Sequence, residues 1–389
     1  MRRLTLKPGE ERRLRRGHLW IFDNEVKGLP GDLEPGEAVT VVDSNGKLLG
    51  SGTVNPRSRI VCRLYSRRGD QALDVAYFKR RFRSCQTLRE RLGFTDVYRL
   101  VHAEADGLPG LVIDRFGSFF TVQHNAAGMD RRKELVLQAL DEVFQPRTVL
   151  SMDDNPSRAL EGLPSEVAWA GEEPPEIAWY EQDGLQWPID LSEGQKTGAY
   201  LDQVFNRREM ARYCRGARVL DAFSYTGGFG ALAAKYGAKE VVLADRSERA
   251  LELAKEMFAR NGLPEPRFEQ ADLLHNAPKA KALGGPFDMV VSDPPPLIPN
   301  KGSKRDGLKK YLGVFTDAMR WTGPEGLTAV FSCSHHAGRD DILEQVKRAG
   351  RRAQKRLRRL AIYGASPDHP VAVGHPETEY LHGILVEVG

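Results

Sequence analysis

The sequence predicts a multidomain α/β protein that ends in a doubly wound parallel sheet. Its 389 residues are enough for two to three domains at ~150 residues each. Three segments differ in pattern: residues 1–73 are β-rich, residues 74–190 mix helices with hairpins, and residues 191–389 alternate strands with helices. Such alternation is typical of a parallel sheet whose two faces are covered by helices.

Residues 1–73 are expected to form a small β-rich module. Asn45-Gly46 separates the β-rich runs 38–43 and 47–50, and an Asn-Gly pair in that position is a strong hairpin signal. The alternating residues 59–65 predict a further strand, and little in this segment has the spacing of a long helix.

Residues 74–190 are expected to form a central α+β domain. Apolar residues at helical spacing predict helices over 75–92 and 129–144. The other expected elements are a hairpin over 107–122, a strand over 148–152 and a hairpin that turns at Asp183-Gly184. The acidic stretch that contains Glu172-Glu173-Pro174-Pro175 predicts a linker or an exposed loop.

Residues 191–389 supply the parallel sheet. Strands are predicted over 218–223, 240–245, 287–293 and 327–333, and helices over 227–236 and 247–260. Ser247 is the expected N-cap of the second helix. Ligands of doubly wound sheets bind at the carboxyl ends of the strands. The side chains predicted at those ends are Asp221, Asp245, Asp293 and Cys333.

Basic residues are concentrated in three runs, although the net charge is only +4. Residues 1–16 contain seven basic side chains, residues 79–91 contain six and residues 347–359 contain eight, against two, one and no acidic ones. One such run alone is most simply a solvated helix face. Three runs rich in arginine, whose forked guanidinium suits phosphate, favour an anionic polymer as partner.

Composition and cysteine usage exclude several classes of protein. Hydrophobic residues make up 41% and charged residues 28%, as in an ordinary globular chain, and no apolar run approaches the ~20 residues of a membrane span. The N-terminus lacks the apolar region of a signal peptide. The four cysteines contain no C-x-x-C pair, so neither a zinc site nor a disulfide framework is expected. We therefore expect a cytoplasmic protein with no membrane partner and no metal.

A glycine-rich turn and a series of acidic residues predict a nucleoside site. The turn Gly227-Gly228-Phe229-Gly230 lacks the G-x-G-x-x-G spacing of a dinucleotide site. Instead Asp221, Asp245 and Asp272 each follow a β-rich run, where Asp245 could accept both ribose hydroxyls and Asp272 could contact an adenine amino group. An acidic site without a phosphate-binding lysine suits a cationic, phosphate-free nucleoside, S-adenosylmethionine. The expected cofactor-binding residues are Asp221, Phe223, Ser224, Tyr225, Thr226, Gly227, Gly228, Asp245, Arg246, Asp272, Leu273 and Asp293.

Two strand ends carry groups suited to catalysis. Asp293 precedes three prolines, which hold it in a rigid extended loop where its oxygens could bind a base edge or an amino group. Cys333 lies at a strand end between two serines, whereas the usual place of a cysteine is the core. We expect that usual place for Cys62, Cys85 and Cys214.

Methylation of pyrimidine C5 is the chemistry that requires a thiol in this position. Thiolate addition at C6 makes C5 nucleophilic toward a sulfonium methyl group; a base then removes the C5 proton and the thiolate leaves. Asp293 would stabilise the adduct. His335 and His336 are equally consistent with proton carriers or phosphate contacts and with polar loop residues.

The chain resembles the PUA-domain-containing cytosine-5 methyltransferases of large-subunit ribosomal RNA along nearly its whole length. The residues that carry the resemblance are 16–22 (RGHLWIF), 107–117 (GLPGLVIDRFG), 194–203 (GQKTGAYLDQ), 223–229 (FSYTGGF), 331–334 (FSCS) and 368–371 (DHPV). The family usually continues Asp-Pro-Pro with Lys-Phe and has Tyr-Lys-Asp downstream, where this chain has Pro296-Leu297 and Tyr311-Leu312-Gly313. Both departures lie in the loop expected near the target base.

The resemblance implies a PUA-like RNA-binding domain over 1–73, a central α+β domain over 74–190 and a class I (Rossmann-like) methyltransferase domain over 191–389. It implies S-adenosylmethionine as cofactor, a cytidine of large-subunit rRNA as target, Cys333 as nucleophile and self-association as a homodimer. It also implies that Lys196, Thr197 and Gly198 lie beside the cofactor.

Two other functions stay open from the residues alone. Asp-Pro-Pro motifs also serve methyltransferases that modify an exocyclic amine of guanine or adenine, a reaction that needs no thiol. The third alternative is a non-catalytic RNA-binding assembly factor, which the intact acidic series and glycine turn argue against.

Overall fold

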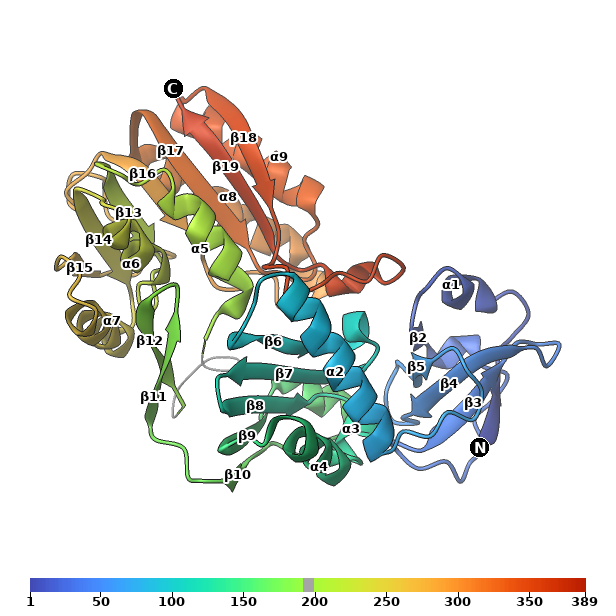
Figure 1. The fold of residues 1–389 in the computed structure, drawn as a ribbon. Helices are drawn as coiled ribbons and strands as arrows, with labels where there is room; N and C mark the ends of the chain where they lie inside the picture. The colour runs from blue at the N-terminus through green and yellow to red at the C-terminus, as the bar shows by residue number, and fades with distance from the viewer. Residues whose placement is uncertain (192–198) are drawn as a thin grey trace. The chain divides into compact units, whose positions relative to one another are not determined.

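The computed structural model describes residues 1–191 and 199–389 and divides into two compact units (Figure 1). Unit 1 consists of Met1–Tyr180, Ile189–Leu201 and Pro367–Thr378, and unit 2 of Glu181–Pro188, Asp202–Ser366 and Glu379–Gly389. The first two predicted domains therefore fall largely in unit 1 and the third largely in unit 2, while the boundaries at 73 and 190 stay predictions. Within the described ranges, no helix combines the length and the apolar character needed to cross a bilayer.

The N-terminal part of unit 1 is a five-stranded sheet with the strand order β1-β3-β4-β5-β2. Its elements are β1 (Arg2–Thr5), α1 (Glu11–Arg15), β2 (Trp20–Ile21), β3 (Ala38–Val42), β4 (Leu48–Val54) and β5 (Cys62–Ser66). The predicted hairpin at Asn45-Gly46 is confirmed: an Asp43 carboxylate oxygen accepts the backbone N–H groups of Asn45 and Lys47, both at 2.9 Å. Gly46 adopts φ +81°, which the turn requires.

The central part of unit 1 is a second five-stranded sheet with the order β10-β9-β8-β7-β6. Its strands are β6 (Val97–His102), β7 (Leu111–Phe116), β8 (Phe119–His124), β9 (Thr148–Asp153) and β10 (Glu166–Gly171), and its helices are α2 (Val75–Arg91), α3 (Ala127–Asp130) and α4 (Lys133–Phe144). The predicted hairpin over 107–122 is confirmed as β7 and β8, and α2 and α4 pack against each other. Their apolar faces share one buried core with the sheet.

The helix predicted over 129–144 is confirmed for residues 133–144, but it does not continue back to Met129, because the chain breaks between α3 and α4. The Arg132 guanidinium donates to the carbonyl of Gly128 at 2.8 Å, the oxygen that the Arg132 N–H would take in a continuous helix. Arg132 itself has the non-helical angles φ −122° and ψ 23°. Apolar periodicity continues across the break, so it could not reveal a side chain that competes for the carbonyl.

A two-stranded hairpin, β11 (Ile177–Gln182) and β12 (Leu185–Asp190), follows the acidic stretch. Its two turn residues, Asp183 and Gly184, have φ of +57° and +63°. Two left-handed residues in succession are the mark of a type I′ turn, which matches the twist of paired strands. The predicted turn is therefore confirmed.

Unit 2 contains a seven-stranded sheet with the order β15-β14-β13-β16-β17-β19-β18. Its strands are β13 (Arg218–Ala222), β14 (Glu240–Asp245), β15 (Arg267–Gln270), β16 (Phe287–Ser292), β17 (Thr322–Ser332), β18 (Leu357–Tyr363) and β19 (His382–Val388). β14, β13, β16 and β17 are parallel, as predicted, and β15 is a further parallel strand that was not among the predicted ones. β19 is antiparallel to both β17 and β18. The two antiparallel strands at the edge were not predicted.

Helices complete unit 2: α5 (Val204–Ala211), α6 (Gly228–Lys235), α7 (Glu248–Arg260), α8 (Lys304–Trp321) and α9 (Arg339–Ala353). The Ser247 hydroxyl accepts the N–H of Ala250 at 3.2 Å and confirms the predicted N-cap of α7. α8 and α9 pack together, α8 against β16 and β17 and α9 against β19.

The described residues of the two units also contain short 3₁₀ turns, at Asp23–Glu25, Ala103–Asp106, Pro156–Glu161, Leu201–Gln203, Lys301–Ser303 and Pro376–Thr378.

Candidate active site

The loop after β13 is held in an unusual conformation by the end of the neighbouring strand β14. Phe223 and Tyr225 have φ of +63° and +50°, in the left-handed region that costs a non-glycine residue about 1–3 kcal/mol. One oxygen of Asp245, the last residue of β14, accepts the Tyr225 N–H at 2.9 Å. Its other oxygen accepts the Ser247 N–H at 2.9 Å, so Asp245 fixes both this loop and the start of α7. Strained, over-determined backbone of this kind is concentrated at binding sites.

The glycines that follow allow α6 to lie close to its neighbours. A Cβ atom on Gly228 would lie 2.6 Å from Nε of Arg207, and one on Gly230 would lie 2.4 Å from a methyl group of Leu243. Gly227 has φ +77°, the left-handed conformation that glycine adopts without strain. Each of the three glycines in the predicted turn is therefore explained by the structure: Gly227 by its backbone conformation, and Gly228 and Gly230 by close neighbours.

Asp221 lies inside β13 with 1% of its surface exposed. Its carboxylate accepts the Gly230 N–H at 2.8 Å and thereby ties the first turns of α6 to the strand. Burial raises the pKa of Asp221 to about 8, against the Gly230 hydrogen bond and the charge of Arg207, which lower it. The structure thus places this residue beneath the turn, as a support for it.

The raised pKa makes a prediction about stability. Between about pH 4 and pH 8, Asp221 is protonated in the folded protein and ionised in the unfolded chain. The free energy of unfolding therefore decreases as the pH rises from about 4 toward 8. Asp221→Asn keeps an oxygen for Gly230 and cannot ionise. We expect its melting temperature to rise above that of the wild type as the pH increases, measured on the cofactor-free protein at about pH 5 and pH 8.

The control for this prediction is Asp306→Asn, which removes an exposed carboxylate of α8 whose side chain is 76% accessible. That variant is expected to follow the wild-type pH dependence. If Asp221→Asn also follows the wild-type curve, the carboxyl group ionises alike in the folded and unfolded states.

The next predicted cofactor residues lie after β14 and β15. Arg246 is exposed and Leu273 is buried. One oxygen of Asp272 accepts the backbone N–H groups of Leu274 and His275 at 3.0 and 3.1 Å, and the other lies 3.0 Å from Nδ1 of His275. The hydrogen bond with His275 lowers the pKa of Asp272. Asp272 therefore presents a carboxylate at the surface, and its contact with an adenine amino group stays a prediction.

Asp293 is the first residue after β16, and a network of buried amides orients it. Its carboxylate accepts Nε2 of Gln203 at 2.9 Å, and Oε1 of Gln203 accepts Nδ2 of Asn206 at 2.6 Å. Asn206 also donates to the Gly364 carbonyl at 2.9 Å. Gln203 and Asn206 are 2% and 0% exposed, so both amides are held in place by packing. Sequence reasoning did not assign a role to Gln203, whose only signal is its place in the 194–203 motif.

Cys333 is the first residue after β17 and is half-buried, whereas the other three cysteines are buried. Its sulfur lies 3.9 Å from the carbonyl oxygen of Pro294. The parallel pairing of β16 with β17, in which Ser292 lies opposite Val330, brings both strand ends to the same edge. Burial raises the pKa of Cys62, Cys85 and Cys214 to about 12, so these thiols are poor nucleophiles.

Ser334, which follows Cys333, binds the loop that begins at Asp293 and holds it next to the end of β17. Its hydroxyl oxygen accepts the backbone N–H groups of Leu297 and Ile298 at 3.2 and 3.3 Å, and lies 2.8 Å from the hydroxyl of Tyr311 on α8. Ser334 and Tyr311 are both buried. The loop that contains Asp293 and the strand end that contains Cys333 are therefore one hydrogen-bonded assembly, a function of Ser334 and Tyr311 that sequence reasoning missed.

The two histidines after Cys333 are both exposed. The ring of His335 stacks on Tyr380, with centroids 5.1 Å apart and an interplanar angle of 28°. The Tyr380 hydroxyl in turn donates to Asp202 at 2.7 Å. The ring of His335 therefore has a structural partner in Tyr380. Whether either histidine carries a proton, contacts a phosphate or is only a polar loop residue stays untested.

The order of the strands also sets the distance between the glycine turn and the thiol. β16 lies between β13 and β17, so two strand spacings, roughly 10 Å, separate the ends of β13 and β17. The Phe331 ring at the end of β17 stacks on Phe229 of α6, with centroids 5.5 Å apart. Lys196, Thr197 and Gly198, the other predicted cofactor contacts, lie outside the described residues.

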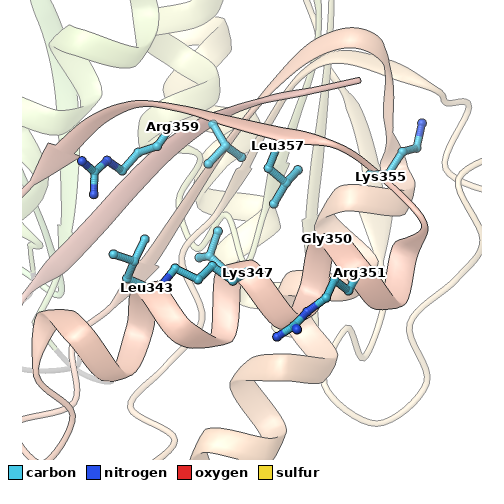
Figure 2. Close-up of a pocket in the computed structure, with 9 residues that line it drawn as sticks. Leu343, Lys347, Gly350, Arg351, Lys355, Leu357 and Arg359 are labelled. Atoms are coloured by element: carbon cyan, nitrogen blue, oxygen red, sulfur yellow. The ribbon is translucent and has the colours of Figure 1, made fainter.

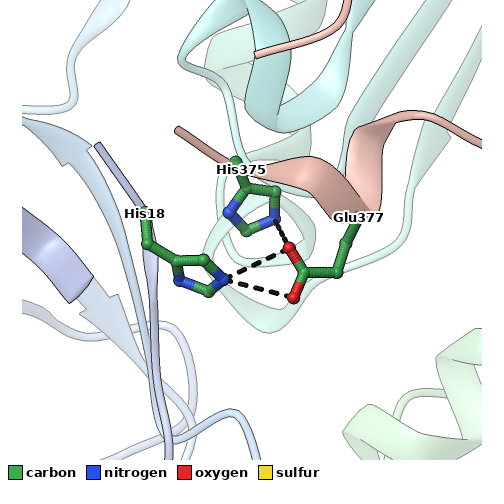
Figure 3. Close-up of side chains that lie close together, drawn as sticks. All are labelled: His18, His375 and Glu377. Atoms are coloured by element: carbon green, nitrogen blue, oxygen red, sulfur yellow. Dashed lines mark hydrogen bonds and ion pairs between the residues drawn. The ribbon is translucent and has the colours of Figure 1, made fainter. Parts of the chain in front are cut away.

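A second cluster of titratable side chains, His18, His375 and Glu377, lies in unit 1, with ligand atoms within 4.8 Å of one another (Figure 3). The backbone N–H groups of Trp20 and Leu19 donate to Nδ1 of His18 and of His375, at 3.1 and 3.3 Å. Nδ1 of His18 also lies 3.3 Å from the carbonyl oxygen of Trp20. Nε2 of His18 and of His375 face the Glu377 carboxylate, at 3.3 and 3.9 Å.

The chain matches known families, named relatives and solved structures. Residues 4–67 match the PUA-like domain family, and residues 161–363 match the family of S-adenosylmethionine-dependent methyltransferases. Proteins named ribosomal RNA large subunit methyltransferase I are 34% identical in Erwinia tasmaniensis and 35% identical in Klebsiella pneumoniae, with 99% of this chain and 98–99% of theirs covered. A methyltransferase structure complexed with S-adenosylhomocysteine covers all of both chains at a TM-score of 0.85 and 21% identity.

Proposed function

Because this chain belongs to the S-adenosylmethionine-dependent methyltransferases, and within them to the family of ribosomal RNA large subunit methyltransferase I, we propose that it forms 5-methylcytidine in large-subunit rRNA. The observation that carries the proposal is the position of Cys333. It is the least buried of the four cysteines, it directly follows β17, the strand next to the Asp293 loop, and its sulfur lies 3.9 Å from the Pro294 carbonyl oxygen in that loop.

The Cys333 thiolate performs the first and last steps of the proposed reaction. Its sulfur adds to C6 of the cytosine, which breaks the C5–C6 double bond and gives C5 the electron pair for a new carbon–carbon bond. S-adenosylmethionine, when bound, would supply an electrophilic methyl group, whose bond to the sulfonium breaks as C5 attacks it and leaves S-adenosylhomocysteine. A base then takes the proton from C5, the electrons restore the double bond, and the sulfur leaves C6 as thiolate.

Asp293 holds the cytosine during these steps. Its carboxyl group can bind N3 and the neighbouring amino group of the base edge, where charge develops as the thiolate adds. Gln203 donates to one carboxylate oxygen at 2.9 Å and fixes the plane of the group. Because Gln203 and Asn206 are buried, this orientation is set before the RNA binds.

The residues around the β13 loop fit the cofactor. The Ser224 hydroxyl, in the strained loop, is 6% exposed and has no hydrogen-bond partner among residues 1–191 and 199–389. A buried hydroxyl without a partner costs about 1–3 kcal/mol, which a bound polar group would recover. Asp245 and Asp272 supply carboxylates for ribose and for an amino group, and Asp221 supports the turn from below.

The direct test is the identity of the methylated nucleoside. We expect the purified protein to transfer labelled methyl groups to unmodified large-subunit rRNA, and digestion followed by mass spectrometry to give 5-methylcytidine. Bisulfite sequencing of the same RNA then locates the cytidine, and small-subunit rRNA serves as the matched control substrate. Methylguanosine or methyladenosine as the product would replace the proposal with an exocyclic-amine reaction, and absence of any product would favour a non-catalytic role.

A further inference from the structure

Two hollows lined by basic side chains lie on either side of α9 in unit 2. The first, of about 440 Å³, is formed with β18, and Figure 2 shows Leu343 and Lys347 of α9 facing Leu357 and Arg359 of the strand. The second, of about 620 Å³, is formed with the start of α8. Their basic lining residues are Lys347, Arg351, Lys355 and Arg359 in the first and Lys301, Lys304, Arg305, Lys309 and Arg348 in the second.

No carboxylate lines either hollow within the described part of the chain, and nearby acids pair with only some of the nine cations. Lys304 pairs with Asp341 at 2.7 Å and Lys309 with Asp306 at 3.1 Å. Glu344 alone serves both Lys347 and Arg351, at 3.6 Å each. For Lys301, Arg305, Arg348, Lys355 and Arg359, the structure gives no carboxylate within 4.0 Å among residues 1–191 and 199–389.

The nine cations of the two hollows belong to a chain whose net charge is only +4. A solvated helix face of a near-neutral protein normally intersperses both signs, because like charges at short range repel one another. Clustered cations that lack internal partners are suited to a polyanion, which releases its own counterions when they bind.

The floor of the first hollow adds a feature that phosphate alone does not require. We define this floor as the four apolar lining residues, Leu343, Val346, Leu357 and Val386, of which the two valines are buried. Single-stranded nucleic acid presents base faces and charged phosphates side by side, and proteins bind it with apolar or planar surfaces next to lysine and arginine. An acidic protein segment would not need the apolar floor.

The second hollow is connected to the candidate active site through the chain itself. The loop that begins at Asp293 runs into the 3₁₀ turn Lys301–Ser303 and then into α8, both of which contribute to the hollow. Ser334 holds this loop at Leu297 and Ile298, next to Cys333. An RNA strand with one base at Cys333 therefore has a basic surface beside it.

We propose that these two hollows, with the exposed side of α9 between them, form a docking surface for the RNA that flanks the target nucleotide. The proposal rests on the proposed function for the identity of the RNA. The basic side chains bind backbone phosphates, and the apolar floor of the first hollow receives an unpaired base. Phosphate contacts supply affinity, and the choice of nucleotide stays with the active site.

Charge reversal in pairs tests each hollow separately. Lys301→Glu with Arg305→Glu alters the second hollow, and Lys355→Glu with Arg359→Glu alters the first. The matched control is Lys239→Glu with Lys255→Glu, two exposed lysines of unit 2 outside both hollows. The measurements are equilibrium binding to large-subunit rRNA at several salt concentrations and, separately, binding of S-adenosylhomocysteine by calorimetry.

Each pair in a hollow is expected to weaken RNA binding at least tenfold and to reduce the slope of log K against log salt by about 0.7–0.9 for each phosphate that the protein no longer neutralises. Affinity for S-adenosylhomocysteine should not change in any variant, which shows that unit 2 is folded. RNA affinities within twofold of the control would overturn the docking surface. Since binding is measured without turnover, a product other than 5-methylcytidine would refute the proposed function and leave this result standing.

Discussion

Replacing Cys333 with alanine is expected to abolish methyl transfer to rRNA, with a loss of at least ~10³-fold in turnover. Without the thiolate, C5 of cytosine does not gain the electron density that it needs to attack a methyl group. A 10³-fold loss corresponds to about 4 kcal/mol of transition-state stabilisation. The side chain is half-buried at the end of β17 with its sulfur 3.9 Å from the Pro294 carbonyl, so removal of this one atom should leave the fold intact.

The measurements for Cys333→Ala are single-turnover methylation, rRNA affinity and calorimetric binding of S-adenosylhomocysteine. Only the first should change. Cys214→Ala is the matched control, since its thiol is buried and its pKa is raised to about 12. RNA that contains 5-fluorocytidine provides a second readout: fluorine cannot leave C5 as a proton does, so the wild-type protein should remain covalently attached through Cys333. Wild-type turnover by Cys333→Ala would eliminate the thiol mechanism.

The sequence predicts β13, β14, β16 and β17 of the unit 2 sheet, because each contains a buried run that is followed by a candidate functional residue. β15 has no buried residue and was not predicted. Asp245, Asp293 and Cys333 all lie at the carboxyl edge, as expected. Asp221 was expected at the end of its strand but lies one residue before that end, inside β13. Because successive side chains of a strand point to opposite faces, this shift of one residue buries Asp221, which supports the glycine turn through Gly230. Apolar runs define a strand, but they do not tell which face its last residues occupy.

The antiparallel edge of the same sheet could not be predicted, for an identifiable reason. β18 has the sequence Leu-Arg-Arg-Leu-Ala-Ile-Tyr, and all of its residues are exposed or partly exposed. Its arginines belong to a basic run that began on α9, so composition suggested one charged segment where the structure has a helix and a strand. The pairing partner, β19, comes about twenty residues later in the chain, and long-range pairing leaves no local signal.

The residues that orient the candidate catalytic groups could not be predicted from the sequence either. Gln203 and Ser334 act through hydrogen bonds to elements that are 90 and 36–37 residues away. A buried glutamine or serine has no distinctive spacing, and its usual role is a satisfied polar group in the core. Sequence motifs can nominate groups such as Asp293 and Cys333, whereas the residues that orient them are recognised only when the fold brings them together.

Replacing Asp293 with asparagine is expected to reduce turnover by roughly 10²–10³-fold with little change in rRNA affinity. The carboxylate lies at the edge where the cytosine must bind, and the substitution removes the charge while preserving the shape. Loss of one pre-organised electrostatic contact in an active site typically has this magnitude. Turnover equal to the wild type would remove Asp293 from the mechanism.

A double-mutant cycle with Gln203 separates chemistry from positioning. Gln203→Ala alone is expected to lower kcat about tenfold and to leave KM for RNA nearly unchanged, because Gln203 acts on the Asp293 carboxylate through a 2.9 Å hydrogen bond. In the Asp293→Asn background, the same Gln203→Ala change should have a smaller effect, since the negative charge that Gln203 orients has been replaced by a neutral amide. Gln270→Ala, an exposed glutamine at the end of β15, is the control. Additive losses would mean that Gln203 contributes by another route, such as packing of α5, and that the orientation of Asp293 does not depend on it.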